Sequence, residues 1–103
     1  MPGAVASGTF ANTTIAFVGN PSEVCVVPYG TTNIKLTTLG LDGSNTVKTQ
    51  KRTTPGGAYV DQTTYSTDQT NTLIPVAAGE EWRLLTVTMQ TMKDIRYRLS
   101  SES

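Results

Sequence analysis

The sequence predicts an all-β protein, an antiparallel β-sandwich or jelly roll built from about seven or eight short strands. Apolar residues recur with a period of two in short runs, and Gly, Pro, Asn or Asp interrupts the chain roughly every 8 to 12 residues. Threonine is frequent and often paired, and its β-branched side chain suits a pleated strand. A barrel is the alternative architecture.

The runs with strand character differ in how regularly they alternate. The last one alternates most clearly, so Ile95, Tyr97 and Leu99 are predicted to point inward while Arg96 and Arg98 point outward. The predicted strands are residues 13–18, 23–27, 33–41, 46–54, 58–64, 72–76, 82–89 and 94–100.

Turn-forming residues separate these runs. Asp42-Gly43-Ser44-Asn45 predicts a tight hairpin turn, and Gly40 predicts a bulge because the apolar phase shifts beside it. Residues 46–54 are polar on both faces, which predicts an edge strand or projecting hairpin paired with residues 58–64. Pro75 interrupts the run 72–76.

The length of 103 residues is that of one small domain. Residues 1–12 are small and uncharged, so we expect an extended N-terminal arm there, with a disordered terminus as the alternative. The β-sandwich domain is then expected to span residues 13–101.

The charge balance argues against anionic partners. The formal net charge is zero and only 16% of residues are charged, against about 25% in a typical soluble domain. Because long-range attraction is absent, we expect no nucleic-acid partner. No apolar run approaches the roughly 20 residues of a membrane span, so we expect no membrane partner and synthesis in the cytoplasm.

The single cysteine, Cys25, lies in an apolar run and is expected to be buried.

The residue set offers little for catalysis. Histidine is absent, which excludes Ser-His-Asp and Cys-His arrangements and removes the commonest metal ligand. The adjacent acids Glu80 and Glu81 follow a glycine and are expected to form a solvated turn. Neither a calcium-loop spacing nor a phosphate-binding glycine pattern is present. We therefore expect no enzyme, no cofactor and no metal site.

Basic residues and aromatic residues each offer a binding hypothesis. Lys48, Lys51 and Arg52 would form a basic stripe with Arg96 and Arg98 if their strands were adjacent. The alternative is a solvated or subunit-facing edge. Aromatic side chains stacked on sugar rings would give a carbohydrate platform, and the alternative is that its tryptophan belongs to the core. The candidates for such a platform are Trp82, Tyr29, Tyr59 and Tyr65.

The chain resembles small virion proteins of tailed bacteriophages, most closely capsid decoration (cement) proteins and related head or tail accessory proteins. Three features carry the resemblance: the small-residue N-terminal arm, the hairpin LGLDGSNTVKTQKRTTPGGAYV and the last strand IRYRLS. It covers most of the chain but contains no signature motif.

The resemblance implies a non-enzymatic structural protein on the capsid surface of a virion. Its partner would be the major capsid protein, bound between subunits, and the protein would be a homo-oligomer, a dimer or trimer. We place the contacts on the arm and the basic hairpin, because exposed extended backbone can add strands to a neighbour. The candidate partner-binding residues are Pro2, Val5, Phe10, Lys48, Lys51 and Arg52. A carbohydrate-binding module and a tail or head–tail accessory protein are the alternatives.

Overall fold

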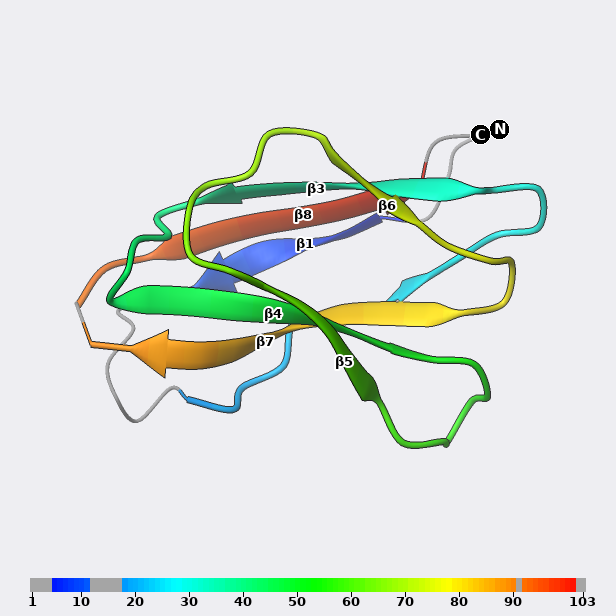
Figure 1. Cartoon of the computed structure of the whole chain (residues 1–103), viewed down its shortest axis with the longest axis horizontal. Coiled ribbons are helices and arrows are strands. Elements are labelled where there is room, and N and C mark those ends of the chain that lie inside the picture. The colour runs from blue at the N-terminus through cyan, green and yellow to red at the C-terminus, as the bar shows by residue number, and fades with distance from the viewer. Residues whose placement is uncertain (1–4, 12–17, 91, 102–103) are drawn as a thin grey trace.

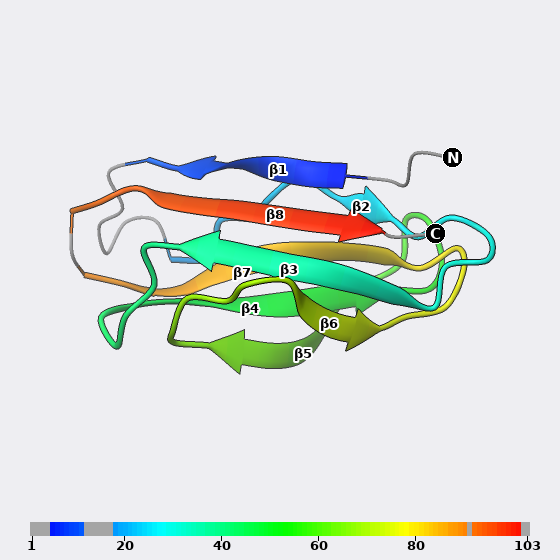
Figure 2. The same cartoon turned by 90° about the horizontal axis from the view of Figure 1, so that it is seen from above.

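A computed structural model describes residues 5–11, 18–90 and 92–101, and it confirms the predicted all-β sandwich. Two antiparallel sheets of four strands face each other, and no helix occurs in the described residues (Figure 1; Figure 2). Sheet I has the strand order β1-β8-β3-β6 and sheet II the order β2-β7-β4-β5. The strands are β1 (Val5–Phe10), β2 (Cys25–Val26), β3 (Asn33–Leu39), β4 (Asn45–Arg52), β5 (Val60–Tyr65), β6 (Thr72–Pro75), β7 (Glu81–Met89) and β8 (Ile95–Ser101).

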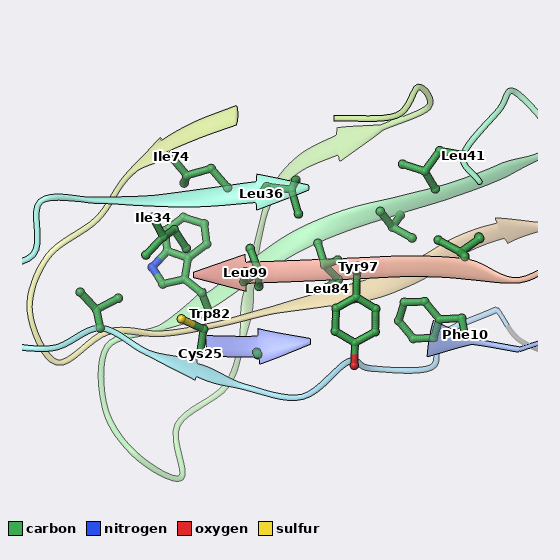
Figure 3. Close-up of a cluster of buried hydrophobic side chains, with 14 of the residues drawn as sticks. Phe10, Cys25, Ile34, Leu36, Leu41, Ile74, Trp82, Leu84, Tyr97 and Leu99 are labelled. Atoms are coloured by element: carbon green, nitrogen blue, oxygen red, sulfur yellow. The ribbon is translucent and has the colours of Figure 1, made fainter. Parts of the chain in front are cut away.

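The core lies between the two sheets and is built from the alternate residues of each strand that point inward (Figure 3). On β8, Ile95, Tyr97 and Leu99 are buried while Arg96 and Arg98 are exposed, which confirms the predicted alternation. Strands in the other sheet contribute in the same way, with Val47 of β4 and Trp82 and Leu84 of β7. Cys25 is also buried, as predicted, and burial raises the pKa of its thiol.

The prediction that residues 1–12 lie outside the sandwich is wrong for residues 5–10. These form β1, which pairs with β8 in an unbroken register from Val5↔Ser100 to Phe10↔Ile95. Ala6 and Phe10 belong to the core, and the Phe10 and Tyr97 ring centroids are 5.0 Å apart. Small residues serve this strand because Tyr97 fills the space beside it: a Cβ on Gly8 would lie 2.7 Å from the Tyr97 hydroxyl. Most of the predicted strand 13–18 falls outside the described residues.

Strand β4 lies between β7 and β5, so the prediction of an edge strand is wrong, although its pairing with β5 is confirmed. A polar strand can occupy this central position because its polar groups are partnered. On the inner side, Thr49 donates its hydroxyl to the Thr63 carbonyl at 3.3 Å and accepts from the Thr63 amide at 3.1 Å. Strand β5 is the edge instead, and a register shift between Lys48 and Gln50 bends the pair.

The predicted turn at Asp42 is confirmed, but it connects the two sheets and is not a hairpin within one. Asp42 and Asn45 exchange backbone hydrogen bonds, and the Asp42 carboxylate accepts from the Ser44 and Asn45 amides at 2.8 and 2.9 Å. Gly40 lies just after β3, whose register with β8 runs without a shift to Leu39, so the prediction of a bulge is wrong. The φ of Gly40 is 112°, and a Cβ there would lie 2.5 Å from the Asp94 carbonyl oxygen. Pro75 is the last residue of β6, an edge strand, where its missing N–H costs no ladder bond.

Candidate protein-docking face

The predicted contacts of the N-terminal segment do not form one exposed surface. Pro2 lies outside the described residues. Val5 is 50% exposed on the outer side of β1, whereas Phe10 is buried against Tyr97 at the other end of the strand. Only Val5 of these three is therefore placed on the surface by the described structure.

The three predicted basic contacts are all engaged within the chain. Lys48 forms an ion pair with Asp61 at 2.8 Å, and Lys51 forms one with Glu80 at 3.2 Å. Arg52 binds Glu81 at 2.6 Å through Nη2 and at 2.9 Å through Nε. These cations therefore neutralise carboxylates on β5, on β7 and in the turn that precedes β7.

A stack of side chains extends this network across the outer face of sheet II. The Tyr59 ring lies 4.7 Å from the Arg52 guanidinium carbon and 3.8 Å from that of Arg83. Arg83 Nε also donates to the side-chain oxygen Oε1 of Gln50 at 2.9 Å. Gln50 in turn donates to Asp61 at 2.8 Å, and this bond, together with Lys48, lowers the pKa of Asp61.

The prediction that Glu80 and Glu81 form a solvated turn is wrong. Glu80 is buried, and its Oε1 accepts from the Ala77 amide at 2.8 Å and from Trp82 Nε1 at 3.2 Å. Burial alone would raise the pKa of Glu80, but these two bonds and Lys51 outweigh it, so the pKa is lowered. Glu81 begins β7 and pairs with Arg52.

The four candidate aromatic residues do not form a platform. Trp82 is 3% exposed and belongs to the core, and Tyr65 packs against that core. Tyr59 is stacked by two arginines, and only Tyr29 stands fully in solvent, at 96% exposure. The core alternative for Trp82 is confirmed.

The outer face of sheet I has a different chemistry. Arg98 of β8 lies between Ser7 of β1 and Thr37 of β3, and Arg96 lies between Thr9 and Leu39. Both arginines are exposed, and neither forms an ion pair or side-chain hydrogen bond within the described part of the chain. The four strands of this sheet contain no acidic residue.

Apolar side chains border these arginines. Val5, Ser100, Lys35 and Leu73 follow one another across the sheet in one row of paired positions, which adds a third cation to the face. Leu39 and Leu73 are 60% and 61% exposed. We call this surface the arginine face, and it comprises Val5, Lys35, Leu39, Leu73, Arg96 and Arg98.

No protein-family model and no curated protein matches the chain. In the described residues, no three His, Cys, Asp or Glu side chains gather where they could hold a metal ion. Nor does that part of the chain contain a helix long and apolar enough to cross a membrane.

The sequence identified the outward direction of Arg96 and Arg98 but not the face to which they belong. They do not extend the Lys48 to Arg52 stripe, because β8 and β4 lie in different sheets. Lys35 and Leu39 alternate with the core residues Ile34 and Leu36 along β3, which is the sequence signal that they share an outer face. Arg96 and Arg98 have no acidic neighbour on the sheet because β8 is paired with β1 and β3, which contain no acidic residue.

Proposed function

We propose that the protein is a non-enzymatic structural protein of a virion, which decorates a phage capsid by binding between major capsid subunits through its arginine face. The observation that carries the proposal is the pair of exposed arginines, Arg96 and Arg98, which have no intramolecular ion pair in the described structure. Arginine is enriched in protein interfaces, where its planar guanidinium binds carboxylates through two parallel hydrogen bonds.

The form of the face favours a protein partner. Its cations stand on a β-sheet and are bordered by the exposed side chains of Leu39 and Leu73, so docking would bury apolar surface together with the charges. A nucleic acid would be a weaker fit, because the chain has no net positive charge and this face presents no aromatic side chain for stacking. The occupant we propose is an acidic surface of the assembled major capsid protein.

The mechanism would be preferential binding to the assembled shell. A ligand that binds the assembled state and not the separate subunits stabilises the assembly by mass action. No bond is made or broken in this function, and the chain needs no cofactor for it. Ion pairs formed by Arg96 and Arg98 would position the protein, while the apolar border excludes water from them.

Co-sedimentation with capsids of the phage that encodes the chain tests the proposal. We expect Arg98→Glu to weaken binding about tenfold or more, since truncating or reversing one member of a buried interfacial charge pair costs at least about 2 kcal/mol. Lys48→Glu is the matched control, because it makes the same charge change on sheet II and should leave binding intact. Equal binding of the wild type and Arg98→Glu would refute the proposed docking face.

A further inference from the structure

Strand β1 is the least protected of the four sheet edges. It contributes six consecutive residues, Val5–Phe10, to an unbroken antiparallel register, and it contains no proline, no charge and no bulge. Figure 2 shows it as the outermost strand of sheet I, and no described strand pairs with its other side. Its second row of backbone N–H and C=O groups therefore faces away from the sheet.

The other three edges each carry a feature that discourages strand addition. Strand β2 has two residues and lies between Pro21 and Pro28. Strand β6 has four residues and ends at Pro75. Strand β5 carries Asp61 and pairs with β4 through a register shift. Short strands, prolines, charges and bulges are the usual means by which proteins prevent edge-to-edge pairing, and β1 has none of them.

We propose that two copies of this chain pair through their β1 strands, antiparallel and about a twofold axis, so that the two sheets I form one continuous sheet. The outward side chains of β1 near this edge are small and uncharged, namely Ser7 and Thr9, with Val5 at its start. A second copy therefore meets neither bulk nor charge at the edge. The zero net charge of the chain also leaves no overall repulsion between copies.

The side-chain alternation and the length of β1 together favour two symmetric registers, because a twofold axis at Ser7 pairs residues 5–9 of each copy, an axis at Gly8 pairs residues 6–10, and an axis at any other residue pairs a shorter stretch. Opposed residues of antiparallel strands point to the same face, so outward residues must meet outward residues. A twofold axis at Ser7 places Ser7 opposite Ser7 of the second copy. An axis at Gly8 places Ser7 opposite Thr9. Both registers keep Ala6 and Phe10 on the core side of the continuous sheet.

The cations of the arginine face do not oppose this pairing. The two β8 strands would be separated by three strand spacings, about 14 Å in total. Repulsion between exposed charges is largely screened beyond about 8 Å at physiological ionic strength. Pairing would instead place two arginine faces side by side on one sheet, which would make docking to a repeating surface bivalent.

Sizing with light scattering on the wild-type protein is the first test, and we expect a mass twice the 11.0 kDa of one chain. Disulfide cross-linking then locates the interface. Ser7→Cys should cross-link with itself if the axis lies at Ser7. If the axis lies at Gly8, an equimolar mixture of Ser7→Cys and Thr9→Cys should form the cross-linked dimer that neither variant forms alone. Opposed Cα atoms at about 4.5–5.5 Å lie within the range of a disulfide.

Leu73→Cys provides the matched control, since it places an exposed thiol on β6, at the opposite edge of the same sheet. We expect at least tenfold slower cross-linking for this variant. A wild-type monomer at every concentration, or cross-linking of Leu73→Cys as fast as that of the β1 variants, would overturn the proposal. Dimerisation through β1 does not depend on capsid binding, so a dimer that fails to bind capsids would refute only the proposed function.

Discussion

The two outer faces of the sandwich use their cations in opposite ways. On sheet II, Lys48 and Arg52 each bind a carboxylate, and Arg83 binds Gln50 and stacks on Tyr59. On sheet I, Arg96 and Arg98 have no such partner in the described residues. An outward cation therefore stabilises the fold where a neighbouring strand supplies an acceptor, and it is available to another molecule where none does.

The difference arises from the neighbours and not from the strands that carry the cations. Both strands carry two basic residues on the outer face of their sheet, Lys48 and Arg52 on β4 and Arg96 and Arg98 on β8. Strand β4 is flanked by β5 and β7, which supply Asp61 and Glu81, whereas β8 is flanked by β1 and β3, which supply serine and threonine. A solvated arginine contributes little to stability, so Arg96 and Arg98 are not explained by a contribution to folding.

We expect the strongest destabilisation on replacing Glu80, the buried carboxylate beside sheet II. Glu80→Ala removes the acceptor for Trp82 Nε1 and for the Ala77 amide, so we expect the free energy of unfolding to fall by about 1–3 kcal/mol. Chemical denaturation measures it. Glu80→Gln is the control, because its carbonyl oxygen can accept both bonds and only the Lys51 ion pair is lost. An unchanged stability for Glu80→Ala would contradict a structural role for this carboxylate.

Acid should weaken the same network progressively. The pKa of Glu80 is lowered in the folded protein, so its stabilising contribution is complete above its unfolded pKa of about 4.3 and is lost as the pH falls through the folded value. We expect the free energy of unfolding to decrease on acidification below about pH 4. Glu80→Gln should show a shallower pH dependence in the same measurement, and an identical slope would contradict this assignment.

A smaller effect is expected from the tyrosine between the two arginines. Tyr59→Leu removes the ring that Arg52 and Arg83 contact, and we expect a loss of about 1 kcal/mol with faster amide exchange in β5. Tyr59→Phe keeps the ring and removes a buried hydroxyl that has no hydrogen-bond partner in the described structure. This control should be at least as stable as the wild type; a large loss would show that the hydroxyl, and not the ring, matters.

The smallest effect is expected on sheet I. Arg96→Ala and Arg98→Ala remove no intramolecular ion pair, so each should change the free energy of unfolding by no more than about 0.5 kcal/mol. Arg52→Ala is the counterpart on sheet II and should lower the melting temperature, because Glu81 then loses its partner. Comparable losses at Arg98 and Arg52 would remove the distinction between the two faces.

Local residue patterns predicted most of the strands, because alternation and turn residues act over a few positions. The run 94–100 corresponds to β8 with the predicted inward residues, and the run 82–89 corresponds to β7 with its start shifted by one residue. The predictions for residues 1–12 and 46–54 failed because a neighbouring strand supplies what each segment lacks. Residues 5–10 look too small for a core strand and residues 46–54 too polar for a central one, yet Tyr97 fills the space beside Gly8, and Thr63 satisfies the hydroxyl of Thr49.

The all-β class, the outward direction of Arg96 and Arg98 and the positions of the main turns could be predicted from the sequence, since these depend on residues close together in the chain. The ion pairs of Lys48, Lys51 and Arg52, the burial of Glu80 beside Trp82 and the edge position of β1 became known from the arrangement of the two sheets. These features depend on which strands become neighbours. Strand pairing joins residues far apart in the chain, so it is settled by how the two sheets bury their apolar faces together.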